Sequence, residues 1–348
     1  MKAVLLMAII LVCGGCLQTG YLMQAAYGQD EIGHRARPID KVLADKSVPP
    51  STRTLLSIIP DVKAWGEKRG LEPTDSYRHF VDLRRDACVW VVSASHPLRF
   101  ELETWWFPIV GSVPYLGWFN KRDAERSAAD LAARGLDVDV RGASAYSTLG
   151  WFDDPVLSTM IKPHGGVRAE LVNVVLHESV HATHYVASQS SFNESLADFV
   201  ADTLTLEYLD ERQGLDRWER FAFEEAQARG EERAKRFHDT YKELERVYAS
   251  KRSDSEKLAL KRRITEGLRQ ELGFSRPINN ATLAQSRTYH GGTPVFKELL
   301  TCMRGSWSRF WTAVRRIDAD SFREPQQIEI DAVVRRVLPA ACRAKKRR

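Results

Sequence analysis

The clearest hydrophobic pattern in the chain is helical and begins near residue 168. Apolar residues recur there at the three- and four-residue spacing that buries one side of a helix: Leu171, Val174, Val175 and Val180. A polar break at 188–193 follows, and the helical spacing resumes over 194–211. The pattern predicts two successive helices joined by a short polar connection.

The chain before residue 168 mixes helical and strand-like patterns. Helical spacing occupies three stretches: 21–46, where the pattern is lost near Pro38, 55–68 and 123–134. Alternating or Val- and Trp-rich runs, typical of strands, occupy three others: 88–95, 99–106 and 136–146. This part of the chain should therefore contain a sheet with helices packed on it.

The chain after residue 211 is dominated by charged helical segments. Residues 218–250 and 255–272 have helical spacing, with a Ser-Asp turn and cap between them. We interpret them as a helical hairpin inserted at about 215–272, and helical spacing returns over 294–316. The pattern as a whole predicts an α+β fold with a mixed strand and helix N-terminal half and a predominantly helical C-terminal half.

Composition and charge narrow this picture only slightly. Of 348 residues, 43% are hydrophobic and 28% are charged, which is enough for the core of one large domain or two modest ones. Because no repeat or low-complexity tract divides the chain, one domain over 16–348 is the simplest organisation. The formal charge is only +5, part of it in the basic run at 343–348, so no nucleic-acid partner is expected. The oligomeric state stays open.

The N-terminus resembles a bacterial lipoprotein signal. Met1-Lys2 carries positive charge, residues 3–12 form a short apolar run, and small residues precede Cys16. The resemblance implies that 1–15 is a signal peptide and that Cys16 is lipidated, although the position three before it holds Cys13 instead of an aliphatic residue. Leu17 resembles the sorting pattern of outer-membrane lipoproteins. We therefore expect a lipid-anchored protein of the cell envelope, on the periplasmic face of the outer membrane; secretion without a lipid is the alternative.

Three cysteines remain beyond the signal: Cys88, Cys302 and Cys342. An odd number allows at most one internal disulfide and leaves one thiol unpaired. The spacing does not choose the pair, and it does not fit a cysteine metal cluster.

The sequence His177-Glu178-Ser179-Val180-His181 lies within the first of the two predicted helices. Residues four apart share one face of a helix, so both imidazoles can reach one ion. Two histidines on a water-exposed surface are the alternative, but the apolar residues before the motif favour burial, and burying such polar groups without a partner is costly. We therefore expect Zn2+ as the cofactor, with Glu178 as the general base.

The third metal ligand has several candidates. Glu194, Asp198 and Asp202 follow at four-residue intervals on one face of the second helix, while His184 points away from the first histidine. The run from Asn193-Glu194 to Asp198 resembles the Asn-Glu-x-x-x-Asp run of thermolysin-like gluzincins. That resemblance implies Glu194 as the ligand, with Asn193 beside it and Asp198 orienting the zinc-bound His177 from behind.

Other candidate site residues lie outside the two helices. Gluzincins place a Tyr or His from a later helix on the oxyanion, and Tyr289 and His290 are the candidates here, although an aromatic residue beside Gly-Gly is also common in a packed turn. The edge formed by Ala143 to Tyr146 is the expected binding strand for a peptide or protein substrate. Asp153-Asp154 could hold a substrate ammonium group, or serve as an ordinary turn before proline.

A wider similarity covers nearly the whole mature chain. It is carried by these runs: Gly20 to Gln29, Arg37 to Asp40, Ala145 to Pro155, the His177 motif, Phe192 to Glu194, and Asn279 to Ala281. They are similar to a family of bacterial lipoproteins named putative aminopeptidases. The resemblance implies a zincin-like zinc metallopeptidase, in the first place an aminopeptidase. An envelope endopeptidase is the alternative enzyme, and a lipid-anchored envelope protein with a structural or inactive zinc site is the alternative outside enzymes.

Overall fold

The computed structural model describes residues 16–107, 111–146, 148, 152–161, 165–212, 217–290, 293–340 and 342. Of residues 16–19, 287–290 and 293 it describes the backbone alone. The signal peptide predicted at 1–15 lies outside these residues. Within the described part of the chain, no helix is both long and apolar enough to cross a membrane.

The first part of the chain combines helices and strands. The helices are α2 (Cys16–Arg35), α3 (Ile39–Ala44), α4 (Pro50–Ser57), α5 (Ile59–Glu67) and α6 (Lys121–Ala133). The strands are β1 (Arg37–Pro38), β2 (His79–Val81), β3 (Val89–Ser95), β4 (Trp105–Phe107), β5 (Gly111–Val113), β6 (Leu116–Trp118), β7 (Asp137–Ala143) and β8 (Val156–Leu157).

The rest of the described chain is helical. It contains η1 (Ser158–Ile161), α7 (Val167–Thr183), α8 (Ser190–Glu211), α9 (Arg217–Ala249), α10 (Asp254–Glu271), α11 (Asn280–His290), α12 (Thr293–Cys302), α13 (Trp307–Val314), η2 (Ala319–Ser321) and α14 (Asp331–Arg336). The expected mixed α+β architecture, with the strands in the first half and helices in the second, is confirmed.

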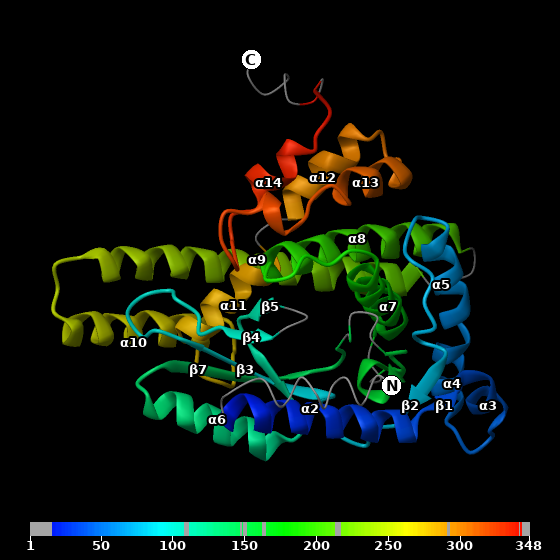
Figure 1. Ribbon diagram of the computed structural model, residues 1–348, viewed down its shortest axis with the longest axis horizontal. Coiled ribbons are helices and arrows are strands. Elements are labelled where there is room, and N and C mark those ends of the chain that lie inside the picture. Colours follow the sequence, from blue (N-terminus) through cyan, green and yellow to red (C-terminus); the bar gives the residue numbers. More distant parts are fainter. Residues whose placement is uncertain are drawn as a thin grey trace.

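The strands form small sheets with simple orders. One runs β6-β3-β7 and is antiparallel, another runs β1-β2-β8, and β4 pairs with β5. In Figure 1, α2 and α6 lie along one side of the β3–β7 sheet, whereas α8 and then α12 to α14 lie on the other. Within the described residues β7 is an edge strand that ends at Ala143, so of the edge predicted over Ala143 to Tyr146 only Ala143 belongs to a strand.

Strand β3 divides its side chains between two cores. Val89 and Val91 belong to the main core, which includes the apolar faces of α7 and α8, whereas Val92 packs in a smaller core under α6. Because successive side chains of a strand point to opposite faces, residues paired with Val91 share its face. Arg141 of β7 is the partner of Val91, so it lies on the sheet face turned toward α7 and α8.

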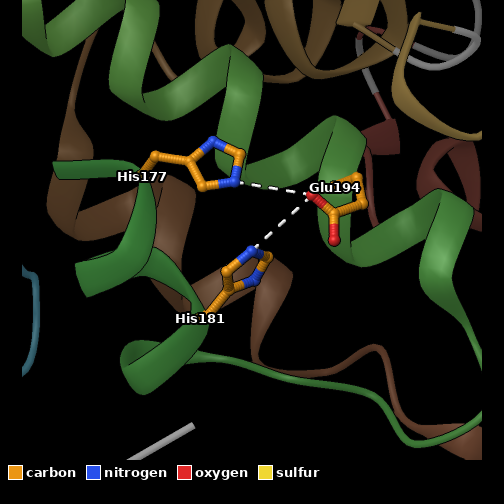
Figure 2. Close-up of side chains that lie close together, drawn as sticks. All are labelled: His177, His181 and Glu194. Carbon is orange, nitrogen blue, oxygen red and sulfur yellow. Dashed lines mark ion pairs between the residues drawn. The ribbon is translucent and has the colours of Figure 1, made fainter. Parts of the chain in front are cut away.

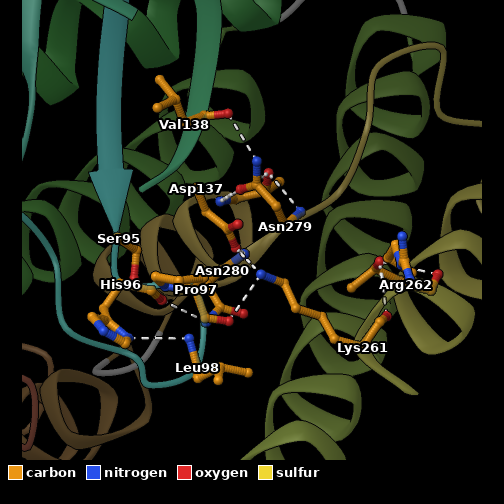
Figure 3. A network of polar contacts seen from close by, with 12 residues as sticks. Ser95, His96, Pro97, Leu98, Asp137, Val138, Lys261, Arg262, Asn279 and Asn280 are labelled. Carbon is orange, nitrogen blue, oxygen red and sulfur yellow. Dashed lines mark hydrogen bonds and ion pairs between the residues drawn. The ribbon is translucent and has the colours of Figure 1, made fainter. Parts of the chain in front are cut away.

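The charged hairpin is fixed to the sheet by a buried polar network (Figure 3). Lys261 of α10 donates to the Pro97 carbonyl oxygen at 2.9 Å and forms an ion pair with Asp137 at the start of β7. Asn280 donates its backbone N–H to the same carboxylate at 2.9 Å and its side-chain amide to the His96 carbonyl oxygen at 2.9 Å. The hairpin is therefore anchored to the sheet edge, and α9 and α10 have the extent that the sequence predicted.

Three predicted boundaries differ from the structure. The helical pattern over 21–46, expected to be lost near Pro38, is interrupted after Arg35, because Arg37–Pro38 pairs with β2 before α3 begins. The strand predicted over 99–106 is reduced to a bridge and the start of β4, because the chain turns back and His96 N–H donates to the Glu101 carbonyl oxygen.

The third wrong boundary is the start of α8, which begins at Ser190 inside the predicted polar break. Asn193 donates to the Val186 carbonyl oxygen at 2.8 Å and accepts from the Val186 N–H at 2.9 Å. Gln326, far along the chain, accepts from the Ser190 N–H at 3.3 Å. These partners satisfy polar groups that are buried, so a polar segment can be helical here.

The C-terminal helices are joined by a disulfide between Cys302 of α12 and Cys342. Cys88 is free and buried. The sequence predicted at most one disulfide among Cys88, Cys302 and Cys342, and it left the pair open.

Candidate metal centre

Helix α7 presents the two histidines on one of its faces. Leu171, Val172, Val175 and Leu176 bury the opposite part of the helix in the main core. The helix ends at Thr183, and the next residue, His184, has an extended backbone and donates its N–H to the Val180 carbonyl oxygen at 2.9 Å. The His184 ring packs edge-on against the Phe192 ring, with 6.0 Å between the ring centroids, and lies outside the histidine cluster.

Helix α8 brings a carboxylate to the histidines. Because α8 begins at Ser190, Glu194 lies one turn inside the helix and is buried. The paired hydrogen bonds of Asn193 to Val186 fix the loop after α7 against this turn. The short connection between the two helices therefore positions the first turn of α8 directly opposite His181.

The nitrogen and oxygen atoms of these residues converge, as Figure 2 shows. Oε2 of Glu194 lies 3.5 Å from Nε2 of His177 and 3.8 Å from Nε2 of His181. One possible ligand atom from each residue lies within 4.8 Å of the others. The side chains are 17%, 7% and 11% exposed for His177, His181 and Glu194, so the cluster is almost shielded from water.

This arrangement fits a metal ion. Zinc binds such nitrogen and oxygen atoms at roughly 2.0–2.2 Å in a tetrahedron, which separates neighbouring ligand atoms by roughly 3.4 Å. The two separations of 3.5 and 3.8 Å are close to that value and too long for good hydrogen bonds. His177, His181 and Glu194 could therefore hold a metal ion, and their donor set is compatible with zinc.

The second nitrogen of each histidine has a different environment. Nδ1 of His177 lies 3.2 Å from Oδ1 of Asp198, one turn after Glu194 on α8. Nδ1 of His181 is buried and has no hydrogen-bond partner within the described residues. Asp202, one further turn along α8, accepts a hydrogen bond from Asn173 at 2.9 Å instead of contacting a histidine.

Burial and neighbouring charges shift the pKa values of the cluster. Burial opposes charge on His177, but the adjacent carboxylates of Asp198 and Glu194 hold its pKa well above the usual value. Burial lowers the pKa of His181 to about 4, so this imidazole is neutral near pH 7. Burial also opposes ionisation of Glu194, yet the two histidines hold its pKa below the usual value. An ionised carboxylate and neutral imidazoles bind zinc, and a metal would displace any proton on His177.

Three residues near the cluster were not singled out from the sequence. Arg141 faces it from β7, and its charge also lowers the pKa of Glu194. The ring of Tyr185 lies 6.5 Å from that of His181. Burial, and then the charge of Glu178, raise the pKa of Tyr77 well above the usual value. Only Tyr185 is near the motif in sequence, so no local pattern indicates the other two.

The predicted substrate-binding residues lie in different settings. Ala143 ends β7 and is paired with Val89, and Tyr146 follows it with its hydroxyl donating to Gln29. Asp153 is exposed, whereas Asp154 is buried and its carboxylate accepts the N–H and O–H of Thr148, both at 2.8 Å. Asp154 therefore stabilises its own loop in this structure.

The remaining predicted residues have side chains outside the described part of the structure. Tyr289 and His290 lie on the last turn of α11, and Cys16 is the first residue of α2. Their proposed roles in oxyanion stabilisation and lipid attachment stay predictions.

Comparison with known proteins gives one match. The sequence model of one protein family, described as "Putative aminopeptidase", matches residues 20–328. No curated protein and no solved structure matches the chain significantly. The matched range contains the whole of α7 and α8, and with them the candidate metal centre.

Proposed function

The chain belongs to the putative aminopeptidase family, and on this premise we propose that it is a zinc-dependent aminopeptidase. The observation that carries the proposal is the convergence of His177, His181 and Glu194, with Glu178 next to the first ligand. A purely structural metal site needs only its ligands, whereas a hydrolytic site also needs a base beside them. Glu178 fills that place.

A bound zinc ion would supply Lewis acidity, which polarises a peptide carbonyl and makes water a better nucleophile. Glu178 would accept a proton from the attacking water and deliver it to the nitrogen of the leaving amine. The negative charge of Glu178 raises the pKa of both His177 and Tyr77, which supports a position of Glu178 at the edge of the cluster. Asp198 would hold the His177 ring in the orientation and tautomer in which Nε2 is free to bind.

The peptide substrate would bind along β7. An edge strand offers unpaired backbone groups to an extended peptide, and β7 is at the edge of its sheet in the described chain. Arg141, on the face of β7 turned toward the cluster, would lie beside the bound peptide. In this arrangement Ala143 and Tyr146 lie near the end of the binding strand.

The proposed location is the cell envelope. The basic and apolar N-terminal sequence before Cys16 supports export and lipidation, and we propose that a lipid on Cys16 anchors the enzyme to the outer membrane on its periplasmic side. A Cys16→Ser variant should then lose acyl labelling and leave the membrane fraction. Continued labelling of this variant would exclude the anchor.

The direct test of the enzyme compares wild type with Glu178→Gln. Both proteins should contain zinc by elemental analysis, but only the wild type should hydrolyse peptides, because the amide cannot accept the proton of water. Glu170→Gln is the matched control, since Glu170 is an exposed acid in the first turn of the same helix. A wild type without zinc would refute the metal site, and a fully active Glu178→Gln would refute the role of the base.

A peptide mixture with mass-spectrometric readout separates the two peptidase types. Stepwise loss of N-terminal residues is expected for an aminopeptidase. Internal cuts would instead identify an endopeptidase. Peptides with blocked N-termini serve as the control, because an aminopeptidase should leave them intact.

A further inference from the structure

Helix α2 has an outward face without charge. Met23 is 61% exposed and Tyr27 is 76% exposed, and Gly20 beside them is exposed as well. No charged residue occurs over 16–29, although 28% of the chain is charged, and the first charged residue of the helix is Asp30. The outward face of a helix in water normally carries charged and polar side chains. The exposed part of α2 therefore has the composition of a contact surface.

The opposite face of α2 is packed on the sheet, which fixes the outward direction. The Tyr21 ring packs edge-on against the Trp118 ring, with 5.4 Å between the ring centroids. Gln24 donates to the Gly117 carbonyl oxygen at 3.2 Å and accepts from the Phe119 N–H at 3.0 Å. Because these contacts hold the helix on β6 and the residue after it, the uncharged face remains turned away from the sheet.

Helix α6 lies on the same side of the sheet as α2 in Figure 1 and has the ordinary surface composition. Its exposed residues are mostly charged: Lys121, Arg122, Glu125, Arg126 and Asp130. The uncharged surface is therefore a property of α2 and not of this whole side of the molecule.

The uncharged face includes the proposed lipid attachment point. Positions 16, 20, 23 and 27 follow one another at intervals of four, three and four residues, so they share one face of the helix. Cys16 is the first residue of α2, so no linker separates it from the helix. At a rise of 1.5 Å per residue, Met23 and Tyr27 lie roughly 10 and 16 Å from Cys16 along the axis. A lipid on Cys16 would therefore bring both side chains close to the membrane surface.

We propose that the face of α2 formed by Gly20, Met23 and Tyr27 lies against the lipid surface of the membrane in which the Cys16 lipid is inserted. This inference rests on the lipid anchor of the proposed function. The apolar side chain of Met23 would enter the boundary between headgroups and acyl chains. Tyr27 suits the headgroup level, because its ring is apolar and its hydroxyl is polar. Since the face carries no charge, the contact depends on buried apolar area and not on anionic lipid.

This contact would give the enzyme a fixed orientation on the membrane. Helix α8 lies on the other side of the β3–β7 sheet from α2 (Figure 1). Glu194 of the candidate metal centre belongs to α8. The centre would therefore be on the side of the sheet that is turned away from the lipid surface.

The test places a fluorescent probe on the lipidated mature protein. Met23→Cys and Tyr27→Cys are each labelled with the fluorophore NBD, and Ser308→Cys, an exposed position on α13, is the control. In vesicles of phosphatidylethanolamine and phosphatidylglycerol that contain a nitroxide headgroup lipid, the probes at 23 and 27 should lose most of their fluorescence. The probe at 308 should keep it. All three variants should have the urea midpoint of the wild type, because the substituted side chains are exposed.

The labelling is specific to the introduced thiol. Cys16 carries the lipid, Cys88 is buried, and Cys302 and Cys342 form the disulfide. A second measurement uses vesicles in which phosphatidylcholine replaces phosphatidylglycerol, at low and at high salt. Quenching at 23 and 27 should be the same in all of them, because an uncharged face has no electrostatic attraction for salt to screen.

The outcomes separate this contact from the anchor. Probes at 23 and 27 that keep their fluorescence, in a protein that stays in the membrane fraction, would overturn the contact and leave the anchor and the peptidase intact. Probes whose emission shifts to the blue without quenching by the nitroxide lipid would identify a second protein chain on the face, which also overturns it. Equal quenching at 308 would exclude the fixed orientation. A wild type that does not enter the membrane fraction would refute the anchor, and the contact with it.

Discussion

Oδ1 of Asp198 lies 3.2 Å from Nδ1 of His177, while Nε2 of the same ring faces Glu194. The two carboxylates come from successive turns of α8, so a single helix supplies both a candidate ligand and the group that orients another ligand. A carboxylate behind a metal-bound histidine fixes the ring tautomer and increases its basicity. The metal affinity of the site should therefore depend on a residue that never touches the metal.

Asp198→Asn should weaken zinc binding by about 10- to 100-fold, the usual effect of losing such a carboxylate. The amide can still contact Nδ1 but no longer carries the charge that increases the basicity of the ring. Competition with a chromophoric chelator measures the affinity. Asp202→Asn is the matched control, because Asp202 lies one turn further on and accepts from Asn173 instead of a histidine. Equal affinities for wild type and Asp198→Asn would contradict the role of Asp198.

The candidate centre could be predicted largely from sequence because its residues lie on two adjacent helices. Helical spacing places His177 and His181 together, and the short connection brings Glu194 opposite them. Arg141 and Tyr77 could not be predicted in this way. Arg141 is turned toward the cluster by strand register, and Tyr77 is held by Asp154 of a distant loop, neither of which leaves a local pattern.

Stability should depend on pH through Asp154. Burial raises its pKa to about 6, from about 4 in an unfolded chain, so the folded state binds the proton more tightly. The resulting stabilisation is complete below pH 4 and is lost as pH rises through 6, a change of about 3 kcal/mol. Asp154→Asn can still accept from the Thr148 N–H through its amide oxygen and donate from its amide nitrogen to the Thr148 hydroxyl, and it should abolish this part of the pH dependence.

Urea unfolding of both proteins at pH 4 and pH 7 checks this prediction. Asp154→Asn should gain stability relative to the wild type at pH 7 and show little gain at pH 4. Asp153→Asn is the control, because this neighbouring side chain is exposed. A difference between wild type and Asp154→Asn that is the same at both pH values would contradict the prediction.

The disulfide between Cys302 and Cys342 should stabilise the C-terminal helices. It closes a loop with a sequence separation of 40, for which the loss of chain entropy in the unfolded state gives about 4 kcal/mol. The double variant Cys302→Ser/Cys342→Ser should unfold at lower urea than the wild type and be insensitive to reductant. Reductant should lower the urea midpoint of the wild type to that of the variant. Cys88→Ala, which removes the free thiol, should keep the sensitivity to reductant.

The fold was predictable where elements repeat a clear period and less so where distant segments meet. The hairpin helices α9 and α10 have the bounds that their helical spacing predicts, but this spacing does not indicate how the hairpin is attached to the sheet. Asn279 donates to the Val138 carbonyl oxygen at 2.8 Å and Asn280 to that of His96. In sequence this Asn-Asn pair indicates only a break between helices, since its partners lie on the sheet edge.

Lys261 provides the last test, because it couples the hairpin to the sheet. Its side chain is 7% exposed, and that of its partner Asp137 is 17% exposed. Lys261→Met leaves the Asp137 carboxylate buried without its cation, which should cost about 3–5 kcal/mol in urea unfolding. Adding Asp137→Asn should recover part of this loss, because the remaining buried charge is removed while the Asn280 N–H keeps an acceptor. Arg263→Met, an exposed change on the same helix, should have little effect. If Lys261→Met were as stable as the wild type, the network would not anchor the hairpin, and the fixed position of α9 and α10 would need another cause.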